Sequence, residues 1–211
     1  VMVELDKISA RIATKLYGHC AAVRQVGFER ARMPGDWFDL VVTNVPFGDY
    51  KVFDLSNRGY SDFNIHNWFI AQSLAMVRPG GLVAVITATS TLDSSGREVR
   101  EYLDQKAELV GAIRLPVGTF TESAGTSVPA DMLFLRRREK SERVLKASEW
   151  SKYPSVPTKE MCLPGWATES KLPSTHINNW FVRNPSSMIG QLNLVSNGYQ
   201  KVLQPVLPED A

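Results

Sequence analysis

Four residues, Asn44, Val45, Pro46 and Phe47, are the first candidates for chemistry in this sequence. They follow the apolar run Leu40–Val42, which is typical of a buried parallel strand, and Gly48 ends the stretch. Ligands of open α/β sheets bind at the carboxyl ends of strands, so an asparagine, a rigid proline and an aromatic ring here indicate a binding site. Asn, Pro and Gly also make ordinary turns, and this motif alone leaves the two interpretations equal.

A second candidate is the acidic end of the first stretch, VMVELD, where Glu4 and Asp6 precede a helical pattern. An acid at the tip of a strand in nucleotide-binding α/β folds accepts hydrogen bonds from ribose hydroxyls. Asp6 is better placed to cap the following helix, so Glu4 is the ribose candidate.

The elements that must position these residues alternate between strands and helices. Strands are predicted at 1–6, 21–29, 37–44, 82–90, 108–116 and 131–138, and helices at 7–17, 64–77 and 94–107. Pro79, Gly80 and Gly81 are predicted as the turn that stops the second helix, and Ser94 or Ser95 as the cap of the third. This order predicts an α/β fold with a mostly parallel sheet, and the short link between the last two strands predicts an antiparallel pair at one edge.

Composition sets broad limits on the class of protein. The 211 residues are 44% apolar, enough for one good core, and the net charge of +2 is too small to name a partner. The basic stretch 136–143 is interpreted as a solvated face. Cys20 and Cys162 are far apart and no histidine has partners at ligand spacing, so neither a disulfide framework nor a metal site is predicted. No apolar stretch is long enough for a membrane span, and the cytoplasm is expected.

The pattern changes near residue 146. Residues 1–145 carry the alternating elements, whereas 146–211 contain seven prolines and only 176–184 has a regular pattern. We therefore predict one domain at 1–145 and a Pro-rich C-terminal extension or second-domain fragment at 146–211.

The order of several segments resembles the catalytic domain of the N6-adenine DNA methyltransferases. These segments are VELD followed by a helix, GFE, FDLVVTNVPFGDY, VRPGGLVAVIT, GAIRLPVGTF and GTSVPADMLFLRRR. The resemblance covers roughly residues 1–140 and is closest to type I modification subunits and to methylases fused to helicases on mobile elements. It implies a Rossmann-like methyltransferase sheet.

The resemblance gives each motif residue a role in transferring a methyl group from S-adenosylmethionine to adenine N6 in DNA. The family's Asn-Pro-Pro-Phe/Tyr motif corresponds to Asn44, Val45, Pro46 and Phe47. The Asn44 side-chain oxygen and the Val45 carbonyl would accept hydrogen bonds from the adenine amine, and Phe47 would stack on the flipped-out base. Valine in place of the first proline costs only backbone stiffness, because any residue supplies the carbonyl.

The resemblance also implies a cofactor site that these residues fill only in part. Glu4 and Leu5 would lie at the ribose of S-adenosylmethionine, and Phe28 and Glu29 at its adenine, although a core phenylalanine beside a surface glutamate is an equal interpretation. The family's first strand and Gly-rich loop precede the segment that begins here at Val1, so an N-terminally truncated domain is expected. The implied partners are DNA and a helicase or specificity subunit or domain, and the open sheet predicts a partner segment, a dimer or a rearranged edge.

Two alternatives remain open at this stage. One is methylation of an RNA base or of protein glutamine, because enzymes that act on those substrates use similar motifs. The other is a non-catalytic, degenerate methyltransferase module kept for DNA binding or assembly.

Overall fold

The computed structural model describes residues 1–53, 59–125, 127–139, 141–142, 144, 146–152, 176–196 and 201–207. Its strands are β1 Met2–Glu4, β2 Val23–Gln25, β3 Phe38–Asn44, β4 Val77–Ala88, β5 Ala107–Arg114, β6 Ala130–Arg137, β7 Gln191–Ser196 and β8 Lys201–Val206. Its helices are α1 Lys7–Tyr17, α2 Ile65–Met76, α3 Ser90–Asp93, α4 Glu98–Lys106, α5 Thr121–Ala124 and α6 Asn179–Arg183, with short 3-10 turns at Phe28–Arg30, Glu149–Ser151 and Pro185–Ser187.

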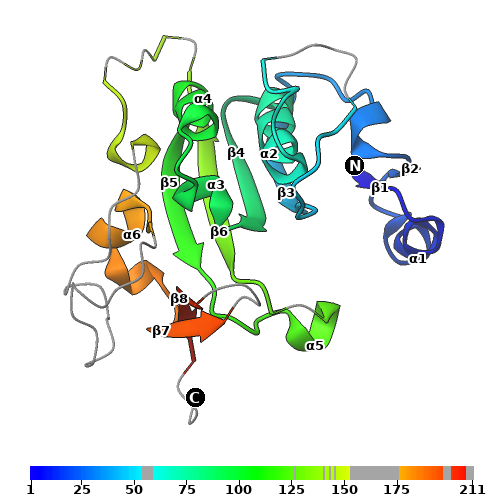
Figure 1. Ribbon diagram of the computed structural model, residues 1–211. Coiled ribbons are helices and arrows are strands. Elements are labelled where there is room, and N and C mark those ends of the chain that lie inside the picture. The colour runs from blue at the N-terminus through cyan, green and yellow to red at the C-terminus, as the bar shows by residue number, and fades with distance from the viewer. Residues whose placement is uncertain are drawn as a thin grey trace.

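The central sheet has four strands in the order β3-β4-β6-β5. β3 pairs in parallel with β4, and β6 lies antiparallel to both β4 and β5. Three of the four strands therefore share one direction, which confirms the α/β fold and the antiparallel pair at the edge. Helices α2 and α4 cover one face of this sheet (Figure 1).

A smaller unit made of β1, α1 and β2 lies beside the β3 edge of the sheet (Figure 1). β1 and β2 pair in parallel with each other, and among the described strands neither pairs with β3. Asp6 begins α1 as predicted, because its side chain accepts a hydrogen bond of 2.7 Å from the Ser9 N–H.

The apolar run in β3 is only half covered. Val41 is partly buried, but Leu40 and Val42 are 52% and 69% exposed. Alternate side chains of a strand point to opposite faces, and α2 covers only one of them. The prediction of a buried strand is therefore wrong for one of its two faces.

Three other local predictions are corrected by the structure. The strand predicted over 21–29 ends at Gln25, and Phe28 and Glu29 form a 3-10 turn instead. Helix α4 begins at Glu98 after Arg97, whose side chain makes no capping hydrogen bond, so the serines at 94 and 95 do not cap it. Pro79, Gly80 and Gly81 lie within β4 rather than in a turn before it.

Gly81 lies against the backbone of β3, and this close approach predicts a sharp effect of adding a methyl group. A Cβ there would lie 2.9 Å from the Arg78 carbonyl oxygen and 3.0 Å from that of Asp39. Backbone atoms cannot rotate away, so Gly81→Ala should lower the free energy of unfolding by about 1–3 kcal/mol. Urea unfolding measures this difference.

The matched control is Gly111→Ala in β5. Its Cβ would meet nothing closer than 3.5 Å, from the Phe134 ring. That variant should be as stable as the parent chain or slightly more so. Equal losses in the two variants would show that close packing at Gly81 is not the cause.

The main core lies between the sheet and its covering helices, and it also contains residues from the C-terminal part of the chain. Trp150, Ile177, Phe181, Met188 and Leu203 are buried in it together with Leu133 and Leu135 of β6. The described residues beyond 145 thus belong to the same core as the residues before it. The division into a domain at 1–145 and an extension at 146–211 stays a prediction. The predicted features at 153–175, including Cys162, lie outside the described residues.

Candidate active site

The motif residues lie where β3 ends, and β4 holds the chain in place. The Val45 N–H donates to the Ile86 carbonyl oxygen at 3.0 Å, and the Val45 side chain is 3% exposed within the main core. Asn44 is exposed beside it, whereas Phe47 is half-buried and packs against the core. The buried Val45 side chain therefore holds the backbone in place, and Asn44 beside it is exposed to solvent.

A cavity of about 730 Å³ opens at this strand end. It is lined by Asn44, Val45, Phe47, Gly48, Asp49, His66, Ala88, Thr89, Ser90, Phe120 and Val128. The lining combines amide, hydroxyl and carboxylate groups with an imidazole and two phenyl rings, a mixture that suits a planar polar ligand. The structure thus brings Asn44, Val45 and Phe47 together at one cavity, and Pro46 is half-buried between them.

His66 was not predicted as part of this site, because the sequence shows no partner near it. It stands at the start of α2, is 2% exposed, and its Nδ1 lies 3.2 Å from the Gly48 carbonyl oxygen. Its Nε2 lies 3.4 Å from Ser90 Oγ, at the start of α3. The imidazole therefore links Gly48, just after the motif, to the start of α3, a relation that only the tertiary structure creates.

Burial lowers the pKa of His66, and this outweighs the raising effects of the Gly48 carbonyl and of Asp49. The unfolded chain, with an ordinary pKa of 6.5, then takes up a proton before the folded chain does as the pH falls. The free energy of unfolding should therefore be unaffected by His66 above about pH 6.5 and should decrease below it, by at most about 1.4 kcal/mol per pH unit.

Urea unfolding at several pH values tests this expectation. His66→Gln should remove part of the loss of stability below about pH 6.5. His19→Gln, at an exposed histidine after α1, is the matched control and should leave the dependence as it is in the parent chain. Identical pH profiles for all three proteins would contradict the assignment to His66.

A buried ion-pair network supports the β4 side of the cavity. Arg114 donates two hydrogen bonds of 2.8 Å to Asp131 and lies 2.7 Å from Asp93, at the end of α3. Burial alone would lower the Arg114 pKa, but attraction to the two carboxylates outweighs it and the pKa is raised. Asp93 also accepts a hydrogen bond from the Asn178 N–H at 2.8 Å, which ties the C-terminal residues to this helix.

The four residues predicted at the cofactor lie elsewhere, on the β1 side. Glu4 ends β1 and its Oε1 accepts the Asp6 N–H at 2.8 Å, while Leu5 is 72% exposed. Phe28 stacks on Phe69 with ring centroids 4.9 Å apart, and Glu29 lies near Arg30 at 3.6 Å. None of the four lines the cavity at Asn44.

The described residues form no group of three side chains that could hold a metal ion. In the same residues, no helix is both long and apolar enough to cross a membrane.

Comparisons with known proteins give the class of fold and then the family. The chain is similar to a class I S-adenosylmethionine-dependent methyltransferase from Listeria monocytogenes (TM-score 0.54, 18% identity, 69% of this chain and 46% of that one). It is also similar to a type I restriction-modification methyltransferase subunit from Streptococcus thermophilus (TM-score 0.53, 17% identity, 65% of this chain and 34% of that one). The fold is therefore the Rossmann-like fold of class I methyltransferases.

The profile of the N-6 DNA Methylase family matches residues 24–164. The chain belongs to this family. It is 33% identical over 147 residues to the "Defense against restriction protein B" of Escherichia phage P1, a match that covers 67% of this chain and 6% of that protein. The chain thus spans less than half the length of each relative named here.

Proposed function

We propose that this chain carries the adenine-binding part of an enzyme that transfers a methyl group from S-adenosylmethionine to adenine N6 in DNA. One observation carries the proposal: in a member of the N-6 DNA Methylase family, Asn44, Val45 and Phe47 meet at one cavity where a sheet strand ends. The chemistry of that residue set matches the demands of the reaction.

The exocyclic amine of adenine is a poor nucleophile, because its lone pair is delocalised into the ring. As the nitrogen bonds to the methyl carbon of a sulfonium, the carbon–sulfur bond breaks and a neutral thioether leaves. The nitrogen thereby gains positive charge, which preorganised acceptors stabilise until it loses a proton to solvent. The Asn44 side-chain oxygen and the Val45 carbonyl would accept the two amine hydrogens. Phe47 would stack on the base once it has left the duplex.

S-adenosylmethionine supplies the electrophilic methyl group when it is bound. The residues on the β1 side fit part of that cofactor. The Glu4 carboxylate, partly buried at a strand end, suits ribose hydroxyls, and the half-buried Phe28 ring suits a purine face. Leu5 and Glu29 are the other two residues that we propose at the cofactor.

The proposed partners are DNA and further protein of a modification system. The S. thermophilus relative is a subunit of a type I restriction-modification system, so a specificity subunit or helicase, on the same chain or a separate one, is the expected companion. We place the activity in the cytoplasm. Residues 1–145 would form the partial catalytic domain and 146–211 its C-terminal extension.

A methyl-transfer assay tests the proposal. The 211-residue chain is incubated with radiolabelled S-adenosylmethionine and with DNA, RNA or protein. We expect label in DNA, recovered as N6-methyl-2′-deoxyadenosine after digestion to nucleosides. Label in RNA or in protein glutamine would replace the proposed substrate, and DNA binding without any transfer would favour a non-catalytic module.

A further inference from the structure

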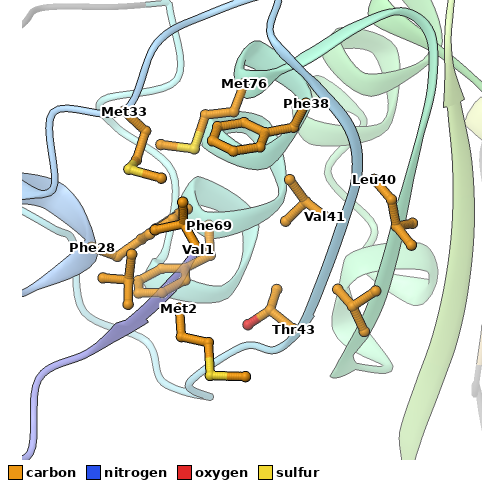
Figure 2. Close-up of a pocket in the computed structure, with 12 residues that line it drawn as sticks. Val1, Met2, Phe28, Met33, Phe38, Leu40, Val41, Thr43, Phe69 and Met76 are labelled. Carbon is orange, nitrogen blue, oxygen red and sulfur yellow. The ribbon is translucent and has the colours of Figure 1, made fainter. Parts of the chain in front are cut away.

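Two cavities other than the one at Asn44 differ in the groups that line them. The cavity between β1 and β3 measures about 310 Å³, and no charged side chain is among the described residues that line it (Figure 2). The α2–α4 cavity, so named because α2 and α4 begin at it, measures about 460 Å³ and is lined by polar and charged groups that include Arg100. Polar groups that converge on a cavity indicate a ligand, so the α2–α4 cavity is a candidate site.

Arg100, in the first turn of α4, is a buried arginine that uses only part of its hydrogen-bonding capacity. Its side chain is 0% exposed, and its Nη1 donates to the Ser94 carbonyl oxygen at 2.7 Å. Its Nε and Nη2 have no hydrogen-bond partner among the described residues. Because Ser94 also lines the α2–α4 cavity, the bond to its carbonyl places the guanidinium at the cavity wall. A buried polar group without a partner in a native fold indicates that a ligand, an ion or a water supplies the partner.

Arg114 shows that this fold can pair a buried arginine completely. Two carboxylates contact Arg114, and its pKa is raised in spite of burial. Burial lowers the pKa of Arg100, and attraction to the charges of Asp93 and Glu98 does not outweigh it. Arginine still keeps its proton near neutral pH. Arg100 is therefore a buried positive charge to which no described carboxylate bonds, and an anion is the partner that it lacks.

The first turns of α2 and α4 add further donors to the same cavity. Asn64 and Arg97, the residues before the two helices, make no side-chain capping hydrogen bond. N–H groups in a first helical turn have no partner within the helix, and they bind phosphate groups readily. The N–H groups at the cavity that remain unbonded among the described residues belong to His66, Asn67, Glu98, Val99 and Arg100.

Three carboxylates also line the α2–α4 cavity, but none of them bonds to Arg100. Asp49, Asp62 and Glu98 are exposed, and Asp62 pairs with Lys51 at 3.0 Å. Within the described part of the chain, these side chains form no group that could hold a metal ion. The carboxylates therefore belong to the solvent side of the cavity, and the buried side is positive.

We propose that the α2–α4 cavity binds a phosphate group, with Arg100 as its charged partner and the first N–H groups of α2 and α4 as further donors. A guanidinium can donate two parallel hydrogen bonds to the oxygens of a phosphate, and Nε and Nη2 of Arg100 are the two nitrogens that lack a partner. Because Arg100 is fully buried, part of the wall must move to admit the phosphate. Residues 94–97, the exposed link between α3 and α4, are that part.

The position of the cavity indicates DNA as the source of the phosphate. Asp49, His66 and Ser90 line both the α2–α4 cavity and the cavity at Asn44, so the two cavities are neighbours. A nucleotide whose base leaves the duplex carries its phosphate groups with it, and contacts to phosphate fix the position of the strand on the protein. This assignment to DNA rests on the proposed function, whereas phosphate binding at Arg100 does not.

The first experiment uses inorganic phosphate as the probe. The Arg100 Nε–H and the Asn67 and Val99 amides of the 211-residue chain are followed by NMR as phosphate replaces chloride at constant ionic strength. We expect saturable shifts of all three. Arg100→Met should weaken phosphate binding by about 10-fold or more. Arg97→Met removes the same charge from an arginine that is exposed and pairs with Glu101 at 3.1 Å, so it should leave binding unchanged.

Thermal unfolding separates binding from a structural role of Arg100. Arg100→Met removes a buried, unpaired charge and keeps a similar volume, so without phosphate this variant should unfold at a temperature no lower than that of the parent chain. Phosphate should raise the unfolding temperature of the parent and of Arg97→Met, because it binds the folded state. It should not raise that of Arg100→Met.

The second experiment distinguishes DNA from a free phosphate compound. A short single-stranded oligonucleotide with one adenine is compared with the same oligonucleotide carrying uncharged methylphosphonates on both sides of that adenine. The natural form should displace inorganic phosphate from Arg100 and bind about 10-fold more tightly than the methylphosphonate form. In Arg100→Met the two forms should bind equally. Phosphate binding that the natural oligonucleotide does not compete for would overturn the assignment to DNA.

Two results would overturn the phosphate site itself. One is an Arg100 Nε–H resonance that does not move during the titration, because water would then be the partner of the guanidinium. The other is an equal response to phosphate in Arg100→Met and the parent chain, because the anion would then bind elsewhere. Phosphate binding at Arg100 in a chain that transfers no methyl group would contradict only the proposed function.

Discussion

Replacing Asn44 with alanine should lower the rate of methyl transfer by about 10²- to 10³-fold, the usual loss when one preorganised partner of the transition state is removed. Asn44 is exposed at the end of β3 and Val45 anchors the strand beside it, so the fold should remain intact. The loss is expected mainly in kcat, because the hydrogen bond strengthens only as the amine gains positive charge. Single-turnover transfer to DNA measures it.

Asn193→Ala is the matched control, because Asn193 is an exposed asparagine on β7, outside the cavity at Asn44. It should transfer methyl groups at the parent rate. A thermal unfolding curve of each variant shows whether the chain is still folded. Unchanged transfer by a folded Asn44→Ala protein would remove Asn44 from the mechanism.

Replacing Arg114 with methionine should lower the free energy of unfolding by about 3–5 kcal/mol, because the substitution leaves the buried Asp131 carboxylate without its partner. The Arg114 and Asp131 side chains are 4% and 0% exposed, and Arg114 also lies 4.3 Å from the centroid of the Phe181 ring. The substitution keeps a similar volume, so loss of charge pairing rather than a cavity causes the effect. The midpoint of urea unfolding measures it.

Arg78→Met is the comparison, because the Arg78 pair with Asp39 is exposed on both sides. Arg78→Met should lower the free energy of unfolding by about 1 kcal/mol or less. Asp131→Asn, which keeps the shape of the side chain and removes its charge, should cost less than Arg114→Met. A loss below about 1 kcal/mol in Arg114→Met would show that this network does not stabilise the fold.

Elements with a clear local pattern were predicted well from sequence. The helical spacing of Ile8, Ile12 and Leu16 and the Asp6 cap gave α1 with its observed bounds at Lys7 and Tyr17. The short link between the last two strands indicated the β5 and β6 pair correctly. These features depend on residues close together in the chain, and local propensity and pattern are sufficient to determine them.

Features that depend on close approach between distant segments were predicted poorly. Proline and glycine at 79–81 are typical of a turn, yet they lie in β4, where Gly81 permits the backbone of β3 to come near. His66 has no partner near it in the sequence, because Gly48 and Ser90 lie 18 and 24 residues away. Such contacts are set by packing of the whole chain rather than by local preference.

The sequence by itself determined the family, the order of the elements and the Asn44 to Phe47 motif at the end of a strand, because each of these lies in contiguous residues. Only the tertiary structure decided that the motif opens into a cavity shared with His66 and Ser90, and that β1 and β3 border a second cavity without pairing. The physical reason is that cavities and free strand edges are properties of surfaces brought together by folding, which no contiguous stretch of residues encodes alone.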